Sequence, residues 1–343
     1  MGEYFSGKRV LLTGHTGFKG AWLLVWLDML GAKVCGVSLE PPTKPSLFSL
    51  LNGADMCSRH EICDIRDAAR LSAIVGDFAP NIVIHMAAQA LVLPSIEDPA
   101  GTISANVAGT ANVLDASRRT ESIERILVVT SDKVYANDGR PHAFVEGDRL
   151  GGHDPYSASK AAAEIIVDSF RAIYFHGRVP VATVRAGNVI GGGDWAPHRV
   201  IPDAVRALEA GKPLVLRRPE AVRPWQHVLD PLSGYLETVR QGIDGPLNFG
   251  PEAAGGRTVA ELVEAFGRHF GGRPGWTLEN ADRPAEATYL ALSSARAREK
   301  LGWRSRLPFE QAIEWTASWY AARTAGKDLA QFTRRQIGEF GRL

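Results

Sequence analysis

The sequence predicts an α/β protein built on a doubly wound, mainly parallel sheet, with a smaller α/β lobe at the carboxyl edge of that sheet. Three observations favour this fold. Short apolar runs alternate with segments of helical periodicity over residues 1–185 of the 343-residue chain. The first run, at 10–13, leads through a glycine-spaced loop into a helical stretch at 21–30, which is a βαβ opening. Beyond residue 185 the alternation becomes irregular.

The later elements follow in chain order. Further strands of the sheet are expected at 33–37, 60–62, 82–85, 126–129 and 181–185, with helices at 67–78, 102–120 and 156–175. In the irregular part, helices are expected at 199–210, 229–240, 259–270 and 308–322, and short strands at 214–216 and 247–249. We therefore predict a sheet domain over 1–185 and a substrate lobe over 186–343, with some chain crossing back to the first domain.

The composition is that of an ordinary globular protein. Hydrophobic residues make up 45% of the chain and charged residues 22%, and the net charge of +1 leaves no overall field to attract nucleic acid or a membrane. The amino-terminal residues lack the basic and apolar regions of a secretion signal. The three cysteines have no zinc-ligand spacing and the nine histidines are scattered, so we expect a cytoplasmic protein without a metal site.

The loop after the first strand has the spacing of a dinucleotide site. It reads Gly14-His15-Thr16-Gly17-Phe18-Lys19-Gly20, a G-x-x-G-x-x-G pattern set between a strand and a helix. Glycines let the backbone approach a pyrophosphate, and the helix amino terminus offers free N–H groups and the positive end of its dipole. A plain glycine turn is the alternative, and Lys19 fits a solvent-exposed position as well as a phosphate contact. The first domain is thus predicted to be a Rossmann domain.

NAD is favoured over NADP as the cofactor. The acidic residue expected at the end of the second strand is replaced by Ser38 and Leu39, and Glu40 lies just beyond, but no arginine follows to bind a 2′-phosphate. Asp64 suits a contact with the adenine edge. For Ala87, Ala88 and Asn106, ordinary packing and helix capping are the alternatives to cofactor binding. The predicted cofactor-binding residues outside the loop are Ser38, Leu39, Asp64, Ile65, Ala87, Ala88, Gln89, Asn106, Thr130, Tyr156 and Lys160.

Two pairs of ionisable residues predict the chemistry. Tyr156 and Lys160 lie four residues apart, hence on one face of a helix, and a nearby ammonium is expected to lower the phenol pKa from about 10, so that the phenolate can act as a base. Asp132 and Lys133 follow the strand at 126–129, where open α/β sheets bind ligands. A solvated turn is the alternative for this second pair.

The second pair suits an elimination. Oxidation of a ring hydroxyl to a ketone acidifies the neighbouring C–H, so Lys133 can remove that proton while Asp132 protonates a hydroxyl that leaves from the next carbon. Asp132 then needs a raised pKa. A simple hydride-transfer enzyme would need only Tyr156 and Lys160.

These motifs resemble the extended short-chain dehydrogenase/reductase superfamily and, within it, the CDP-glucose 4,6-dehydratases. The resemblance covers nearly the whole chain and is carried by the segments at 13–20, 38–43, 130–135, 156–160, 187–195 and 223–230. Most specific are Pro41-Pro42-Thr43 and Gly191-Gly192-Gly193-Asp194-Trp195. Related sugar-nucleotide dehydratases usually carry Asp-Glu where this chain has Asp132-Lys133.

The resemblance implies an NAD-dependent cycle on CDP-D-glucose. Hydride leaves sugar C4, Thr130 contacts the C4 oxygen, Lys133 removes the C5 proton, Asp132 protonates the departing C6 hydroxyl, and hydride returns to C6 to give CDP-4-dehydro-6-deoxy-D-glucose. The implied substrate contacts are Ser95, Asp132, Lys133, Asn188, Asp194, Trp195, Arg199, Arg223, Trp225 and Arg283. A homodimer formed through the helices at 102–120 and 156–175 is also implied, with a role in deoxysugar and surface polysaccharide synthesis.

The sequence leaves alternatives open for the roles of three residues and for the function. Arg199 fits a helix surface as well as a substrate contact, and core packing is a fair reading of Trp195 and Trp225. A nucleotide-sugar epimerase or reductase would share the glycine loop, Tyr156 and Lys160. A non-catalytic NAD-binding sensor or scaffold would keep the loop alone.

Overall fold

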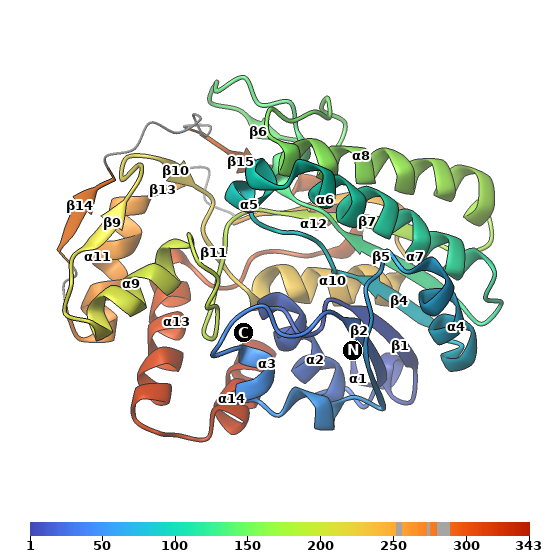
Figure 1. The fold of residues 1–343 in the computed structure, drawn as a ribbon, viewed down its shortest axis with the longest axis horizontal. Coiled ribbons are helices and arrows are strands. Elements are labelled where there is room, and N and C mark those ends of the chain that lie inside the picture. Colours follow the sequence, from blue (N-terminus) through green and yellow to red (C-terminus); the bar gives the residue numbers. More distant parts are fainter. Residues whose placement is uncertain (252–255, 273–274, 280–288) are drawn as a thin grey trace.

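A seven-stranded parallel sheet forms the centre of the computed structural model, which describes residues 1–251, 256–272, 275–279 and 289–343 (Figure 1). The strand order is β12-β7-β5-β4-β1-β2-β3. The strands are β1 (Arg9–Thr13), β2 (Lys33–Ser38), β3 (Arg59–Ile62), β4 (Ile82–His85), β5 (Arg125–Val129), β7 (Val181–Ala186) and β12 (Gly245–Phe249). Successive strands run away from β1 in both directions, so the order reverses between β1 and β4. The predicted doubly wound sheet is confirmed, and ligands bind such sheets at this switch point.

Helices cover both faces of the sheet because its strands are apolar on both sides. Along β1, Leu11 faces a cluster that includes residues of α4 (Ala68–Phe78), α7 (Gly109–Arg118) and α8 (Pro155–Phe170). Val10 and Leu12 face the opposite cluster, which includes α2 (Phe18–Met29) and α10 (Leu229–Gln241). Figure 1 shows these two helical layers above and below the strands. Burial on both faces is typical of parallel strands.

The two helices predicted at 102–120 and 156–175 are interrupted by π-helical turns. The first consists of α6 (Pro99–Ile103), a π turn over Ser104–Ala108, and α7. The second is α8 followed by a π turn over Arg171–Phe175. The start of α8 is set locally: Pro155 occupies the first turn, and Asp154 Oδ1 accepts a hydrogen bond from Ser157 N at 2.9 Å.

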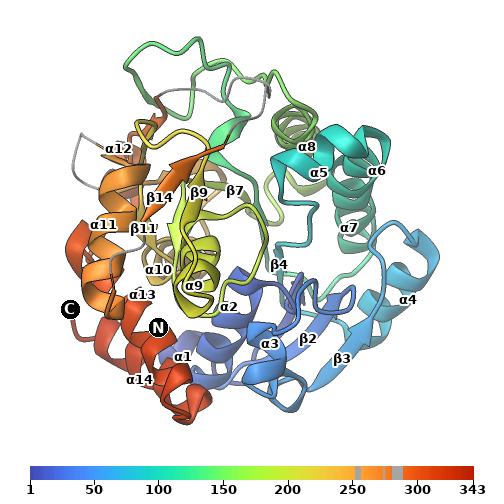
Figure 2. The same cartoon turned by 60° about the vertical axis from the view of Figure 1, so that its left-hand side comes forward.

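The smaller lobe gathers on one side of the molecule (Figure 2). Its main elements are α9 (Val200–Glu209), β9 (Leu214–Leu216), α11 (Val259–Phe270), β14 (Trp276–Leu278) and α13 (Phe309–Thr324). Short strand pairs join β8 (Val189–Ile190) to β11 (Gln226–His227), β10 (Val222–Arg223) to β13 (Arg257–Thr258), and β6 (Ala143–Phe144) to β15 (Ala291–Leu292). The remaining short helices are α1 (Gly2–Phe5), α3 (Leu47–Leu50) and α5 (Val92–Glu97), with 3₁₀ turns at Gly53–Met56 and Asp132–Val134.

One strand differs from the expected arrangement. The segment expected at 247–249 as a strand of the smaller lobe is β12, which extends the large sheet by pairing with β7. The chain therefore crosses back to the first domain, and α12 (Ala295–Leu301), a helix the sequence pattern did not indicate, packs beside β12. The terminal helix α14 (Leu329–Phe340) was also not expected and packs on α2. No helix in these described ranges combines the length and apolar character needed for a membrane span.

Candidate active site

A cavity of about 1330 Å³ opens at the carboxyl ends of the parallel strands, between the sheet and the smaller lobe. Residues that directly follow β1, β4, β5 and β7 line it, as expected at the switch point. The predicted site residues that line the cavity are Gly14, Thr16, Gly17, Phe18, Lys19, Gly20, Ser38, Leu39, Asp64, Ile65, Ala87, Ala88, Gln89, Thr130, Asp132, Lys133, Tyr156, Lys160, Asn188, Asp194, Trp195, Arg199, Arg223 and Trp225. Arg283 lies outside the described residues.

The glycine loop is packed so closely that larger residues would not fit. Gly14 has φ +79°, and a Cβ there would lie 2.7 Å from Ala87 N. A Cβ on Gly20 would lie 2.1 Å from Gly14 O. Helix α2 begins at Phe18, directly after the loop, so its free N–H groups face the cavity end of β1. This cradle fits the pyrophosphate of a dinucleotide.

Hydrogen bonds hold the end of β2 beside the loop. Thr16 Oγ1 donates to Leu39 O at 2.9 Å and lies 2.7 Å from Ser38 Oγ. Asp64, beyond β3, is engaged by Arg66 at 2.6 Å, and this hydrogen bond lowers the pKa of the Asp64 carboxyl. The predicted adenosine end of the cavity therefore carries hydroxyls, the carboxylates of Glu40 and Asp64, and the guanidinium of Arg66.

Three predicted site residues do not line the cavity, and each has a structural contact instead. His15 is buried against β2, with Nε2 2.8 Å from His60 Nδ1, and burial lowers its pKa to about 4. Asn106 donates to Ser159 Oγ and accepts from Gln89 N, both at 2.8 Å. Ser95 Oγ accepts from Tyr156 N at 3.1 Å and so supports the start of α8.

His15, Cys57 and His60 form the one cluster of potential metal ligands that the described residues contain, with candidate ligand atoms within 4.8 Å of one another. The 2.8 Å hydrogen bond between the two imidazoles already uses one nitrogen of each ring. The expectation of a protein without a metal site stays a prediction.

Tyr156 and Lys160 lie on the cavity face of α8, and burial governs the pKa values of both groups. Burial raises the pKa of Tyr156, and Ser131 opposes this rise. Burial lowers the pKa of Lys160 to about 8, and Glu164 opposes this change. The Lys160 ammonium donates to Val129 O at 3.2 Å. Desolvation dominates at both groups. The lowering of the Tyr156 pKa that was expected from Lys160 together with the positive nicotinamide concerns the complex with NAD and stays a prediction.

Asp132 and Lys133 occupy a 3₁₀ turn directly beyond β5. The turn begins at Ser131, whose Oγ accepts a hydrogen bond from Lys133 N at 3.2 Å and donates one to Asp132 Oδ1 at 3.1 Å. Asp132 is 4% exposed, and its Oδ2 is buried without a hydrogen bond. Burial raises the pKa of Asp132, with Lys133 as the main opposing charge, so the expected raised pKa is confirmed in direction. Lys133 is half-buried and lines the cavity.

The cavity wall from the smaller lobe is cationic and aromatic. Arg199 pairs with Asp194 at 3.1 Å, so these two candidates contact each other. Trp195 packs edge-on against Tyr320, and Trp225 Nε1 donates to Arg257 O at 2.9 Å. Both indoles are mostly buried, which favours a packing role for most of their surface.

Lys19 lines the cavity close enough to Lys160 and Asp132 for their charges to affect its pKa. Its ammonium is 5.8 Å from the centre of the Tyr235 ring. Burial, with the charges of Arg199 and Lys160, lowers its pKa to about 8, while Asp132 opposes the shift. The sequence left open whether Lys19 is exposed to solvent or contacts a phosphate. In the structure the Lys19 side chain is not solvent-exposed.

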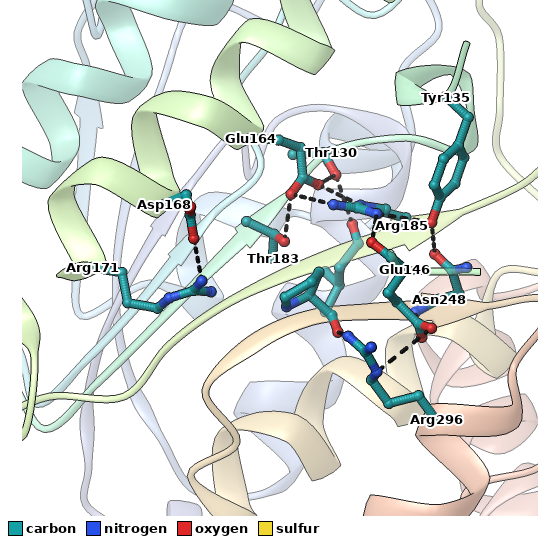
Figure 3. A network of polar contacts seen from close by, with 12 residues as sticks. Thr130, Tyr135, Glu146, Glu164, Asp168, Arg171, Thr183, Arg185, Asn248 and Arg296 are labelled. Atoms are coloured by element: carbon teal, nitrogen blue, oxygen red, sulfur yellow. Dashed lines mark hydrogen bonds and ion pairs between the residues drawn. The ribbon is translucent and has the colours of Figure 1, made fainter. Parts of the chain in front are cut away.

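Sequence reasoning missed several polar residues of the site: Ser131, which lines the cavity, and Glu164 and Arg185, which lie behind it. Figure 3 shows Glu164 in contact with Thr130 and Arg185. Glu164 carried one usable signal, since it lies four residues after Lys160 and hence on the same helix face. Arg185 gave no comparable signal, because a charged residue within a buried strand cannot be assigned a partner from sequence.

The glycine cradle, the Tyr156 and Lys160 pair beside it, and a second lobe closing the cavity define a member of the extended short-chain dehydrogenase/reductase superfamily. Residues 11–316 match the family described as GDP-mannose 4,6 dehydratase, and the chain belongs to this family.

The relatives agree with this assignment. The chain is 40% identical to the CDP-glucose 4,6-dehydratase of Salmonella typhimurium, over 98% of this chain and 97% of that protein. It is 30% identical to a dTDP-glucose 4,6-dehydratase of Xanthomonas campestris, over 90% and 92% of the two chains. Among solved structures, the epimerase Mth375 of Methanothermobacter thermautotrophicus matches with a TM-score of 0.83 at 23% identity, covering 94% and 95%, which shows the fold alone. MoeE5 in complex with UDP-glucuronic acid and NAD matches with a TM-score of 0.78 at 25% identity, covering 92% and 100%.

The glycine cradle leads to a first prediction. Gly20→Ala should weaken NAD binding about tenfold or more, because its Cβ would press on Gly14 O and overpacking costs about 1–3 kcal/mol. Gly76→Ala, on α4 and away from the cavity, is the control, since nothing lies within 4 Å of its added Cβ. Calorimetric titration with NAD measures both affinities. Equal affinity in the two variants would show that the cradle does not hold the nucleotide.

Proposed function

We propose that the protein catalyses the NAD-dependent dehydration of CDP-D-glucose to CDP-4-dehydro-6-deoxy-D-glucose. The observation that carries the proposal is the Asp132 and Lys133 turn, which enters the same cavity as Tyr156 and Lys160. An epimerase or reductase would have no use for this pair. The Salmonella typhimurium relative supports both the reaction and the nucleotide.

Each proton transfer of the reaction is assigned to one residue according to its burial and its place in the cavity. Tyr156 takes the proton of the C4 hydroxyl. NAD, held by the glycine cradle, would supply the acceptor for the C4 hydride and the donor of that hydride to C6. Lys133, half-buried at the cavity surface, removes the C5 proton and, after exchange with solvent, returns a proton to C5 when the hydride reaches C6. Asp132 gives its proton to the C6 hydroxyl, which leaves as water, and the raised pKa of Asp132 favours this acid role. The sum is loss of one water with no net oxidation.

Substrate contacts are assigned from cavity position and charge. Arg223, mostly buried in the cavity wall, suits the diphosphate because a guanidinium binds phosphate oxygens bidentately. Asn188 and Arg199, which also come from the second half of the chain, line the same cavity, and we assign them to the nucleotide sugar. Arg283 is proposed as a further diphosphate or ribose contact.

Two alternatives are less favoured. A nucleotide-sugar epimerase or reductase would leave Asp132 and Lys133 without a task. A non-catalytic NAD-binding sensor or scaffold would not need Thr130, Tyr156 and Lys160 gathered at one cavity.

We also propose a homodimer that works in the cytoplasm, in deoxysugar and lipopolysaccharide synthesis. Support for the dimer comes from exposed apolar side chains on the two helices named for it. Ile103 at the end of α6, Ile165 on α8 and Ile173 beyond α8 are 49%, 61% and 72% exposed. Support for a reducing compartment comes from the three cysteines, which all lie in the described ranges and form no disulfide there.

The main test is a substrate panel. Incubation with CDP-, dTDP-, GDP- and UDP-glucose should give a 4-keto-6-deoxy product from CDP-glucose, with a C4 deuteron recovered at C6 and solvent deuterium at C5. Mass spectrometry and proton NMR follow both labels. Net release of NADH, or C4 inversion without water loss, would contradict the dehydratase and favour the epimerase or reductase.

Lys133→Met separates elimination from oxidation. Product formation should fall by about 10²–10⁴-fold, the range for a lost general base, while NAD binding and the first C4 oxidation persist. Stopped-flow absorbance should then show enzyme-bound NADH without product. Lys33→Met, at the exposed start of β2, is the matched control and should behave as the wild type. Wild-type turnover by Lys133→Met would remove that residue from the mechanism.

Ile165→Glu tests the proposed dimer face. A buried charge at an interface hot spot costs about 2 kcal/mol or more, so the variant should sediment as a monomer at concentrations where the wild type is dimeric. Leu278→Glu, at a 62% exposed position on β14, is the control and should remain dimeric. A monomeric wild type, or loss of the dimer only in the control, would reject this face.

A further inference from the structure

Glu164 lies behind the cavity, between α8 and the strands β5 and β7 (Figure 3). It is one helical turn beyond Lys160 and is 5% exposed. One carboxylate oxygen accepts hydrogen bonds from Thr130 Oγ1 at 2.5 Å and Arg185 Nε at 2.9 Å. The other accepts from Thr183 Oγ1 at 2.7 Å and Arg185 Nη2 at 2.8 Å.

Arg185 fixes this carboxylate in place. The guanidinium holds both oxygens of Glu164, and its side chain is 3% exposed. Its Nη1 donates to Tyr135 Oη at 2.8 Å and to Glu146 O at 3.1 Å, and Tyr135 in turn donates to Asn248 Oδ1 at 2.7 Å. A charge buried this deeply requires a partner, and the bidentate contact supplies it.

The first consequence concerns the hydroxyl of Thr130, which also lines the cavity. A threonine hydroxyl has one hydrogen and two acceptor lone pairs. Because Thr130 donates its hydrogen to Glu164, it can present only lone pairs to a ligand. It can thus accept a hydrogen bond from a sugar hydroxyl but cannot donate one without giving up the contact with Glu164.

The second consequence concerns Lys160. Burial lowers the pKa of this ammonium, and the negative charge of Glu164 acts against the decrease, which leaves it at about 8. Other titratable groups around Lys160 are Tyr156 on the same helix, His85 on β4 and Lys19 on α2. Burial keeps His85 neutral with a pKa of about 3, and Lys19 is a second cation, so Glu164 is the anion that supports the charge on Lys160.

We propose that Glu164, held by Arg185, is a positioning residue for the C4 oxidation: it turns the Thr130 hydroxyl into an acceptor for the sugar hydroxyl and places a fixed negative charge beside Lys160. This role rests on the proposed function for its kinetic part. The hydrogen bonds of Glu164 with Thr130 and Arg185, and its place one helical turn beyond Lys160, do not depend on that function.

Glu164→Gln tests the role, because it keeps the shape and removes the charge. We expect kcat to fall about tenfold or more with a change in KM and NAD affinity below about threefold, since misorientation of a reacting group costs rate and not binding. The isotope effect from C4-deuterated substrate should rise. The decline of activity on the alkaline side should move to lower pH, because loss of a nearby anion disfavours the ammonium of Lys160.

Thr183→Val is the matched control. It removes one hydrogen bond to the same carboxylate in the same buried setting, but leaves Thr130, Arg185 and the charge in place. It should lower stability without moving the pH profile or the isotope effect. An unchanged profile and isotope effect in Glu164→Gln, or an equal shift in Thr183→Val, would overturn the proposal.

A second variant and a second measurement keep the test informative. If Glu164→Gln does not fold because Arg185 is left unpaired, the double variant Glu164→Gln/Arg185→Gln removes both charges together, and a wild-type pH profile in it would count against the role.

The pH dependence of Lys160 acetylation by acetic anhydride, read by peptide mass spectrometry, needs no sugar substrate. Its midpoint should move below the wild-type value when the anion is removed. If no nucleotide hexose is converted, the proposed function fails while this labelling still decides whether Glu164 supports Lys160, and an unmoved midpoint would reject that support.

Discussion

The buried ion pair between Glu164 and Arg185 links the elements that form the reacting site. It joins α8, which carries Tyr156 and Lys160, to β7, and through the hydroxyl of Thr130 it also joins the end of β5. Buried ion pairs contribute little net stability, because desolvation offsets their attraction, and apolar replacements are often as stable. The pair is therefore better explained by the geometry it imposes than by the stability it adds.

Charged side chains of both signs gather at the cavity. The net charge of the chain is +1, and the cations at the cavity include Lys19, Lys133, Lys160, Arg199 and Arg223. Eight Lys and Arg side chains and eight Asp and Glu side chains line it in all, and Asp194 contacts Arg199 at 3.1 Å. The charges of the cavity therefore balance, and recognition of an anionic ligand such as a dinucleotide or a nucleotide sugar depends on where individual cations stand. Part of the lowered pKa of Lys19 has the same local origin, since Arg199 and Lys160 add to the effect of burial.

The sequence predicted what depends on local pattern and missed what depends on packing. The parallel sheet, the glycine loop and the Asp132 pKa direction were predictable from alternation, spacing and the position of a strand end. A short apolar strand such as β12 does not reveal its neighbour, so it was placed in the wrong sheet. The glycine-loop motif predicts the backbone course at His15 but not that its imidazole ring is buried away from the cavity. The pKa of Tyr156 depends on burial, which the spacing to Lys160 does not report, and the partners Glu164 and Arg185 are brought together only by the fold.

Adjacent residues can act as acid and base because the 3₁₀ turn gives them different environments. Asp132 is buried in the cavity wall, where its Oδ2 lies near Gly187 and Pro224 and burial favours the protonated form. Lys133 remains half-buried at the cavity surface, where it can exchange its proton with solvent. Each charge also affects the other: the ammonium of Lys133 limits the rise in the pKa of Asp132. When Lys133 gains the proton from a substrate carbon, this opposition increases, which favours release of the Asp132 proton in the same step. The two roles are thus coupled through their proximity, and a carboxylate at position 133 would keep the sign of that coupling, because it too becomes more positive by one charge when it takes the proton.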